Sequence, residues 1–324
     1  MTGATSGIGR AIVQRFARDG ASIGLIARGR EGLAAARKEV EAAGGRALEL
    51  PCDVADWDAV SAAARAVEEA FGPIDVWVNN AMTTVFAPFK DVDPDEFKRA
   101  TEVTYLGTVW GTKAALDRMQ PRDRGSIVIV GSALAYRGIP LQAPYCGAKH
   151  AIKGFFESVR TEVRHDRSNV HVSMVQLPGH NTPQFLHCRA KMPNVPQPMP
   201  PYYQPEIGAD AVHWAAHNRR RELWVGAPTV KTIIGNRVAP WLVERVLAKQ
   251  GYSGQQTQEP LPPDRPDNLT EPSPGDPGAH GPFDKDARTS SVQTELARRR
   301  GLVGMMTAAV LVLTGVLGGI RRSG

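Results

Sequence analysis

Tyr145 and Lys149 are a pair of residues whose types and spacing suggest chemistry. They are four positions apart, so on a helix they lie on one face. A phenol is a poor base at neutral pH, but a neighbouring ammonium stabilises the phenolate and eases proton transfer. Ser132 ends an apolar segment thirteen residues earlier, where its hydroxyl can hydrogen-bond a reacting oxygen. These residues predict a site that interconverts an alcohol and a carbonyl.

A glycine-rich loop, TGATSGIG, occupies residues 2–9 and runs into an amphipathic helix. Gly3, Gly7 and Gly9 allow a tight turn, a close approach to a pyrophosphate and close packing of the helix on a sheet. The start of the following helix supplies N–H groups and positive potential for phosphates. The loop therefore predicts a dinucleotide-binding site.

The end of the next predicted strand, GLIARGR, bears on which dinucleotide binds. An acidic residue at this place holds the ribose of NAD, whereas an arginine accommodates the 2′-phosphate of NADP. The segment holds no acid, so we expect Arg28 to bind the phosphate of NADP(H), with Arg30 and Ser6 as helpers. The alternative is that these are solvated charges at a strand end.

Short apolar segments alternate with helical patterns up to about residue 230, which predicts a Rossmann-type, doubly wound α/β fold with a parallel sheet. The expected strands are residues 22–27, 46–50, 74–79, 126–131, 170–176 and 222–225. The expected helices are residues 31–43, 56–71, 95–119, 144–165 and 207–218.

The first strand of this fold should precede the glycine-rich loop, yet only Met1 does. In the doubly wound order this strand is the central one, with neighbours on both sides. We therefore expect the first, central strand to be truncated and the natural protein to start some residues earlier.

Composition also distinguishes segments of the chain. Residues 182–205 are rich in proline and predict a lid or binding loop, the alternative being an ordered surface loop. Residues 1–250 are expected to form the catalytic domain, and residues 251–297 a Pro/Gly-rich linker. Residues 298–324 contain an uncharged apolar run, 301–320, flanked by arginines, which predicts a membrane-anchoring helix with the catalytic domain in the cytoplasm. The alternative is a helix docked on protein.

Composition limits the other classes of function. The chain has 324 residues and a formal charge of +6, without a basic stripe, so nucleic-acid binding is not expected. Its three cysteines have unrelated spacings, which argues against a disulfide framework. His213 and His217 are four apart on a predicted helix but have no third ligand nearby, so no metal site is expected.

Together, TGATSGIG, the Asn79-Asn80-Ala81 tripeptide, Ser132 and YCGAK resemble the classical short-chain dehydrogenase/reductase family from residue 2 to about 230. The resemblance implies that Tyr145 is the general acid/base, that Lys149 binds the nicotinamide ribose and lowers the pKa of the tyrosine, and that Ser132 orients the substrate oxygen. It also implies a homo-oligomer. The residues expected to contact the cofactor are Thr2, Gly3, Ser6, Gly7, Ile8, Gly9, Arg28, Arg30, Asp53, Val54, Asn79, Ala81, Tyr145, Lys149, Pro178 and Thr182.

Two positions depart from the family pattern. Thr104 stands where the family has a catalytic asparagine; its hydroxyl is expected to hold a relay water without the amide geometry. Met82 replaces the usual glycine and is expected to narrow the nicotinamide pocket. We expect a reductase of an apolar carbonyl substrate; the alternative is a catalytically impaired scaffold or regulator of the same fold.

Overall fold

The computed structural model describes residues 1–299, and its core is a parallel sheet. β5 is buried at every position and β6 at all but its first, so each needs cover on both faces. The main strands are β1 (Ser22–Ala27), β2 (Arg46–Pro51), β3 (Val76–Asn79), β5 (Ser126–Ser132), β6 (His171–Leu177) and β9 (Glu222–Trp224).

The strands form two groups, β2-β1 and β3-β5-β6-β9, and every pairing within them is parallel. Residues 1–3 lie between the groups. The Thr2 N–H donates to the Val78 carbonyl (3.0 Å), and the Gly3 N–H donates to the Ile26 carbonyl (2.8 Å). The strand order is that of a doubly wound sheet, which confirms the predicted fold class.

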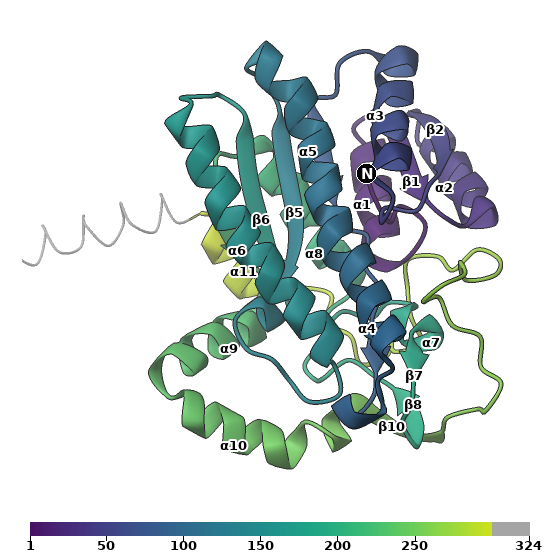
Figure 1. Ribbon diagram of the computed structural model, residues 1–324, viewed down its shortest axis with the longest axis vertical. Coiled ribbons are helices and arrows are strands. Elements are labelled where there is room, and N and C mark those ends of the chain that lie inside the picture. The colour runs from purple at the N-terminus through teal and green to yellow at the C-terminus, as the bar shows by residue number, and fades with distance from the viewer. Residues whose placement is uncertain (300–324) are drawn as a thin grey trace, which may run out of the picture.

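Helices cover both faces of the sheet, and in Figure 1 α5 and α6 lie in front of β5 and β6 with α8 behind them. The buried residues form one apolar cluster on the α3, α5 and α6 side and another on the α1 and α8 side. The bounds are α1 (Gly7–Ala17), α2 (Arg30–Ala42), α3 (Trp57–Phe71), α5 (Gly107–Met119), α6 (Ala143–His165) and α8 (Pro205–His217).

The helix predicted over residues 95–119 differs from the structure. It consists of α4 (Pro94–Thr101), a π-helical turn over Glu102–Leu106 and then α5. A π-helical turn is rare, and it lies here at the position of Thr104. Hydrophobic periodicity shows where a helix runs and does not distinguish this local change of winding.

The lid, residues 182–205, contains short elements that attach it to two other parts of the chain. β4 pairs with β7, and β8 pairs with β10 in the C-terminal part of the chain. The bounds are β4 (Val85–Phe86), α7 (Gln184–His187), β7 (Arg189–Ala190), β8 (Asn194–Pro196) and β10 (Gln256–Pro260).

After β9 the chain forms the α9–α10 hairpin, α9 (Gly226–Val238) and α10 (Pro240–Gln250), which the sequence analysis does not predict. Where a linker is predicted, the chain instead packs against the domain and ends in α11 (Val292–Arg298), as Figure 1 shows. Leu269 and Ala279 of this arm are buried. The predicted membrane helix, residues 301–320, lies outside the described residues, and within residues 1–299 no helix is long and apolar enough to cross a bilayer.

Candidate active site

Three predicted catalytic residues meet at the carboxyl end of β5. Ser132 is the last residue of β5, and α6 starts eleven residues later with proline in its first turn. The helix places Tyr145 and Lys149 one turn apart, with the Lys149 Nζ 5.5 Å from the centre of the Tyr145 ring. The Ser132 hydroxyl lies near the Tyr145 hydroxyl and favours its ionised form. The structure thus brings together the triad that the sequence predicts.

Burial controls the charges of this triad. Burial raises the pKa of Tyr145 well above its usual value, and the nearby Ser132 hydroxyl opposes the shift. Burial lowers the pKa of Lys149 to about 8, and its Nζ donates to the Val130 carbonyl (2.8 Å). Tyr145 is therefore protonated at neutral pH, the state in which a phenol donates a proton.

Backbone atoms of the glycine-rich loop approach each other so closely that a side chain on these glycines would not fit. A Cβ on Gly9 would lie 1.9 Å from the Gly3 carbonyl oxygen. Gly7 has φ +55°, a conformation that favours glycine. The loop therefore brings its backbone to the wall of the cavity at the start of α1, a place that suits the pyrophosphate of a dinucleotide.

Two cavities meet at this loop. One, of about 200 Å³, lies between the loop and the ends of β1 and β2, and we call it the adenosine cavity. The other, of about 260 Å³, contains the triad, and we call it the substrate cavity. Both are lined by Ile8, Asn80, Met82, Thr182 and Gln184. The cavity that contains Arg28 therefore adjoins the cavity that contains Tyr145.

Most of the predicted cofactor residues line these cavities. In the adenosine cavity these are Gly3, Ser6, Gly7, Ile8, Gly9, Arg28, Asp53, Val54, Ala81 and Thr182. In the substrate cavity they are Ile8, Tyr145, Lys149, Pro178 and Thr182. The Asp53 carboxylate also forms an ion pair with Arg99, which fixes its orientation at the cavity wall.

Asn79 and Thr2 are turned away from both cavities. The Asn79 carboxamide accepts from the Trp77 indole (2.8 Å) and donates to the Thr112 hydroxyl (2.9 Å), which ties β3 to α5. The Thr2 hydroxyl accepts from the backbone N–H of Asn80 (3.0 Å). Asn80, which the sequence analysis did not select, lines both cavities and donates to the Gly3 carbonyl (3.2 Å). Successive side chains of an extended chain point to opposite sides, so Asn79 and Asn80 cannot both face the cavity. This alternation is the signal that could have identified Asn80.

Arg30 and Thr104 are also outside the cavities. Arg30 is exposed at the start of α2. The Thr104 hydroxyl donates to the Thr83 carbonyl (2.8 Å) and accepts from the Thr83 N–H (3.0 Å), and Thr104 is fully buried. Thr104 thus holds the backbone of the segment that follows β3. This structural role differs from the expected role, which was to hold a relay water.

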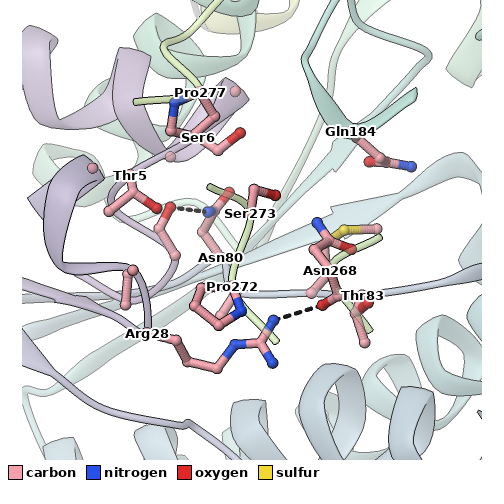
Figure 2. A pocket seen from close by; sticks show the side chains of 18 of the residues that line it. Thr5, Ser6, Arg28, Asn80, Thr83, Gln184, Asn268, Pro272, Ser273 and Pro277 are labelled. Carbon is pink, nitrogen blue, oxygen red and sulfur yellow. Dashed lines mark hydrogen bonds between the residues drawn. The ribbon is translucent and has the colours of Figure 1, made fainter. Parts of the chain in front are cut away.

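The C-terminal arm forms one wall of the adenosine cavity. Figure 2 shows Arg28 directed toward Asn268, with Pro272 and Ser273 in the same cavity. The terminal nitrogens of Arg28 donate to backbone carbonyls at 268–271. Sequence analysis missed these residues, because composition indicates only that a segment is rich in proline and glycine.

More than half of the residues that line the substrate cavity are apolar, and several of these, including Met199, Val243 and Leu247, come from the lid and the α9–α10 hairpin. Two buried polar atoms of its lining residues, His180 Nε2 and Thr229 Oγ1, have no hydrogen-bond partner among residues 1–299. Burial lowers the pKa of His180 to about 4, so this imidazole is neutral at pH 7. An apolar cavity with a few polar groups is typical of a small-molecule site.

Comparison with known proteins agrees with this geometry. A family model described as short chain dehydrogenase matches residues 1–192. An uncharacterized oxidoreductase of Bacillus subtilis is 30% identical over 265 residues, which cover 81% of this chain and 74% of that protein. The 3-dehydrosphinganine reductase of Danio rerio is 35% identical over 190 residues, 57% of each chain. Several of the curated relatives are thus matched over only about half of their length.

Solved structures give the same result. An alcohol dehydrogenase from Thermococcus sibiricus, complexed with 5-hydroxy-NADP, aligns with a TM-score of 0.60 at 26% identity, over 69% of this chain and 94% of its own. A metagenomic short-chain oxidoreductase in complex with NADP aligns with a TM-score of 0.58 at 29% identity, over 69% of this chain and 93% of its own. On its sequence, its sheet and the residues at its site, this chain belongs to the short-chain dehydrogenase family of oxidoreductases.

Proposed function

We propose that this protein is an NADP(H)-dependent oxidoreductase that interconverts a ketone or aldehyde and an alcohol. The observation that carries the proposal is the position of Ser132, Tyr145 and Lys149 in the substrate cavity, which shares part of its wall with the adenosine cavity. When bound, the nicotinamide supplies or accepts the hydride. The rest of the reaction is proton transfer and orientation, which these side chains can perform.

In the reductase direction, the Tyr145 hydroxyl donates its proton to the carbonyl oxygen as that oxygen gains negative charge. The Ser132 hydroxyl hydrogen-bonds the same oxygen and holds it beside the phenol. The Lys149 ammonium lies near the Tyr145 ring and stabilises the phenolate that remains. We favour reduction because cytosolic NADP is generally held in its reduced form.

The proposed cofactor is NADP(H), on account of Arg28 at the end of β1 and the absence of an acid there. Relatives solved with NADP or its derivative support this choice. The proposed substrate is apolar, because apolar side chains dominate the lining of the substrate cavity. We further propose that residues 301–320 attach the catalytic domain to a membrane from the cytoplasmic side, which would suit such a substrate.

The test is an assay of NADPH oxidation over a panel of apolar ketones, with Tyr145→Phe as the variant. The substitution should lower kcat by about 10²–10⁴-fold, because it removes the acid. Binding of NADPH, followed by its fluorescence, should persist. Tyr252→Phe, at an exposed tyrosine, is the matched control.

Activity that survives Tyr145→Phe would show that another group transfers the proton. If the wild-type protein binds NADPH but reduces no ketone of the panel, the alternative is favoured, namely a catalytically impaired scaffold or regulator of the same fold. Thr104 and Met82, which depart from the family pattern, suggest that alternative.

A further inference from the structure

Both terminal nitrogens of Arg28 already donate hydrogen bonds to acceptors of the protein itself. Its Nη1 donates to the carbonyls of Leu269 (3.4 Å) and Thr270 (2.6 Å). Its Nη2 donates to those of Asn268 (2.6 Å) and Glu271 (3.4 Å). An arginine has four terminal N–H groups, so each of them has an acceptor in this arrangement. A phosphate held by two parallel N–H bonds would have to take the place of some of these carbonyls.

These carbonyls belong to a strap, residues 268–278, that crosses the adenosine cavity. At the far end of the strap the Gly278 carbonyl accepts from the Gly7 N–H (2.9 Å), at the start of α1. Beside it, the Asp276 carboxylate forms an ion pair with the buried Arg10 (3.2 Å). The strap therefore places oxygen acceptors against donors at both ends of the cavity.

The two ends of the strap are docked, and its middle is exposed. Leu269 is 2% exposed and packs in a cluster with Val85 and Ala87. The adjacent Asn268 N–H donates to the His187 carbonyl in α7 (2.8 Å). By contrast, Pro272 and Gly275 are exposed. Release of Arg28 would therefore require Leu269 to leave its cluster and this hydrogen bond to break, but no hydrogen bond within the main sheet.

Carbonyl and phosphate oxygens are both acceptors, so they cannot hydrogen-bond each other and they compete for the same N–H groups. NADP(H) carries a 2′-phosphate at this end of the molecule and NAD(H) does not. We propose that strap residues 268–271 compete with the 2′-phosphate of NADP(H) for Arg28, so that binding of NADP(H), but not of NAD(H), requires this end of the strap to release the arginine. This inference rests on the proposed function, because it needs a dinucleotide in the cavity.

The test uses the full-length chain and measures the Kd of NADPH and NADH separately, by energy transfer from tryptophan to the bound nicotinamide. Leu269→Ala removes the side chain that docks the strap while leaving every carbonyl in the chain. We expect the Kd of NADPH to fall several-fold and that of NADH to stay the same. Leu296→Ala, at an exposed leucine of α11, should change neither.

A double-mutant cycle makes the test specific to Arg28. In an Arg28→Ala background, Leu269→Ala should no longer change the Kd of NADPH. If Leu269→Ala does not fold, Asp267→Asn replaces it, because Asp267 holds the same end of the strap through an ion pair with Arg189.

The outcomes separate the two proposals. If the wild type binds NADPH but the strap variant has an unchanged or raised Kd for NADPH, the proposed competition for Arg28 is wrong. The proposed function is not affected by this outcome. Equal tightening of NADPH and NADH also overturns the proposed competition, since the effect would not involve the 2′-phosphate. A wild-type protein that binds neither dinucleotide overturns both proposals.

Discussion

Lys149 brings an amine into a buried site where the charged form is disfavoured. Its pKa is lowered to about 8, from the model-compound value of 10.5, by burial. Between these two pH values the unfolded chain holds a proton that the folded chain lacks. The free energy of unfolding therefore rises with pH between about pH 8 and pH 10.5. Below about pH 8 the buried ammonium of Lys149 lowers the free energy of unfolding.

The first prediction concerns the pH dependence of Lys149→Met. Relative to this variant, the wild type should gain unfolding free energy between pH 7 and pH 10, on the order of 3 kcal/mol in total. Urea unfolding of both proteins at several pH values measures the difference. The variant should also lose reductase activity, because the phenolate of Tyr145 loses its cation.

A matched control is Lys113→Met, at an exposed lysine of α5, which should not alter the pH dependence. If the wild type and Lys149→Met respond to pH in parallel, the amine is not perturbed by burial in solution.

At the scale of elements, the π-helical turn between α4 and α5 positions Thr104 against the segment after β3. The Thr104 hydroxyl satisfies both backbone groups of Thr83, the N–H and the carbonyl. A single hydroxyl can do this because it is both donor and acceptor. The π turn and the threonine thus form one structural unit next to Met82 and Thr83, which line the adenosine cavity.

The second prediction separates a structural role of Thr104 from a catalytic one. Thr104→Val should lower the free energy of unfolding by about 2–4 kcal/mol, because two buried backbone groups lose their partner. Thr104→Ser should keep most of the stability. A valine variant that is as stable as the wild type but has a much lower kcat would instead assign the hydroxyl to proton transfer.

The glycine-rich loop and α1 form a second unit whose packing depends on one glycine. The third prediction is that Gly9→Ala lowers the free energy of unfolding by about 1–3 kcal/mol or more, since the Cβ would overlap the Gly3 carbonyl. Thermal unfolding measures the effect. Gly147→Ala in α6 is the control: nothing lies within 4 Å of its added Cβ. It should raise stability by up to about 1 kcal/mol through helix propensity.

A Gly9→Ala protein as stable as the wild type would mean that α1 can shift away from the loop. Its dinucleotide affinity would then show whether the close approach matters for binding.

At the scale of the whole molecule, the C-terminal arm encloses the cofactor cleft together with the lid. β8 of the lid pairs with β10 of the arm, and Arg189 of the lid holds Asp267 of the arm. The site is therefore built from residues near both ends of the described chain. The arm and the lid are expected to move together when the strap releases Arg28.

The fourth prediction tests the apolar run at residues 301–320. A charged side chain near the centre of a bilayer costs about 2.5–3.5 kcal/mol, so Leu311→Asp with Leu313→Asp should abolish membrane attachment. Flotation of the full-length protein with lipid vesicles measures it. Leu296→Asp, outside the run, should float like the wild type. Flotation that survives the double substitution would assign attachment to another part of the molecule.

The sequence by itself determined the main sheet, the glycine-rich loop and the grouping of Ser132, Tyr145 and Lys149. These follow from short-range regularities: apolar strands, the spacing of Tyr145 and Lys149 on a helix, and the rule that parallel strands end at one edge of a sheet. Such features depend on neighbours in the chain, so the six predicted strands lie within a few residues of their predicted bounds, whereas the short strands β4, β7 and β8 were not predicted.

The tertiary structure alone decided which residues share a cavity. Arg28 meets carbonyls 240 to 243 residues further along the chain, and no local pattern encodes such a contact. The orientation of Asn79 into the core and of Thr104 toward Thr83 likewise depends on how helices pack on the sheet. Prolines and glycines limit the backbone angles of the arm, but its position comes from the apolar and hydrogen-bonding surface that the folded domain offers it.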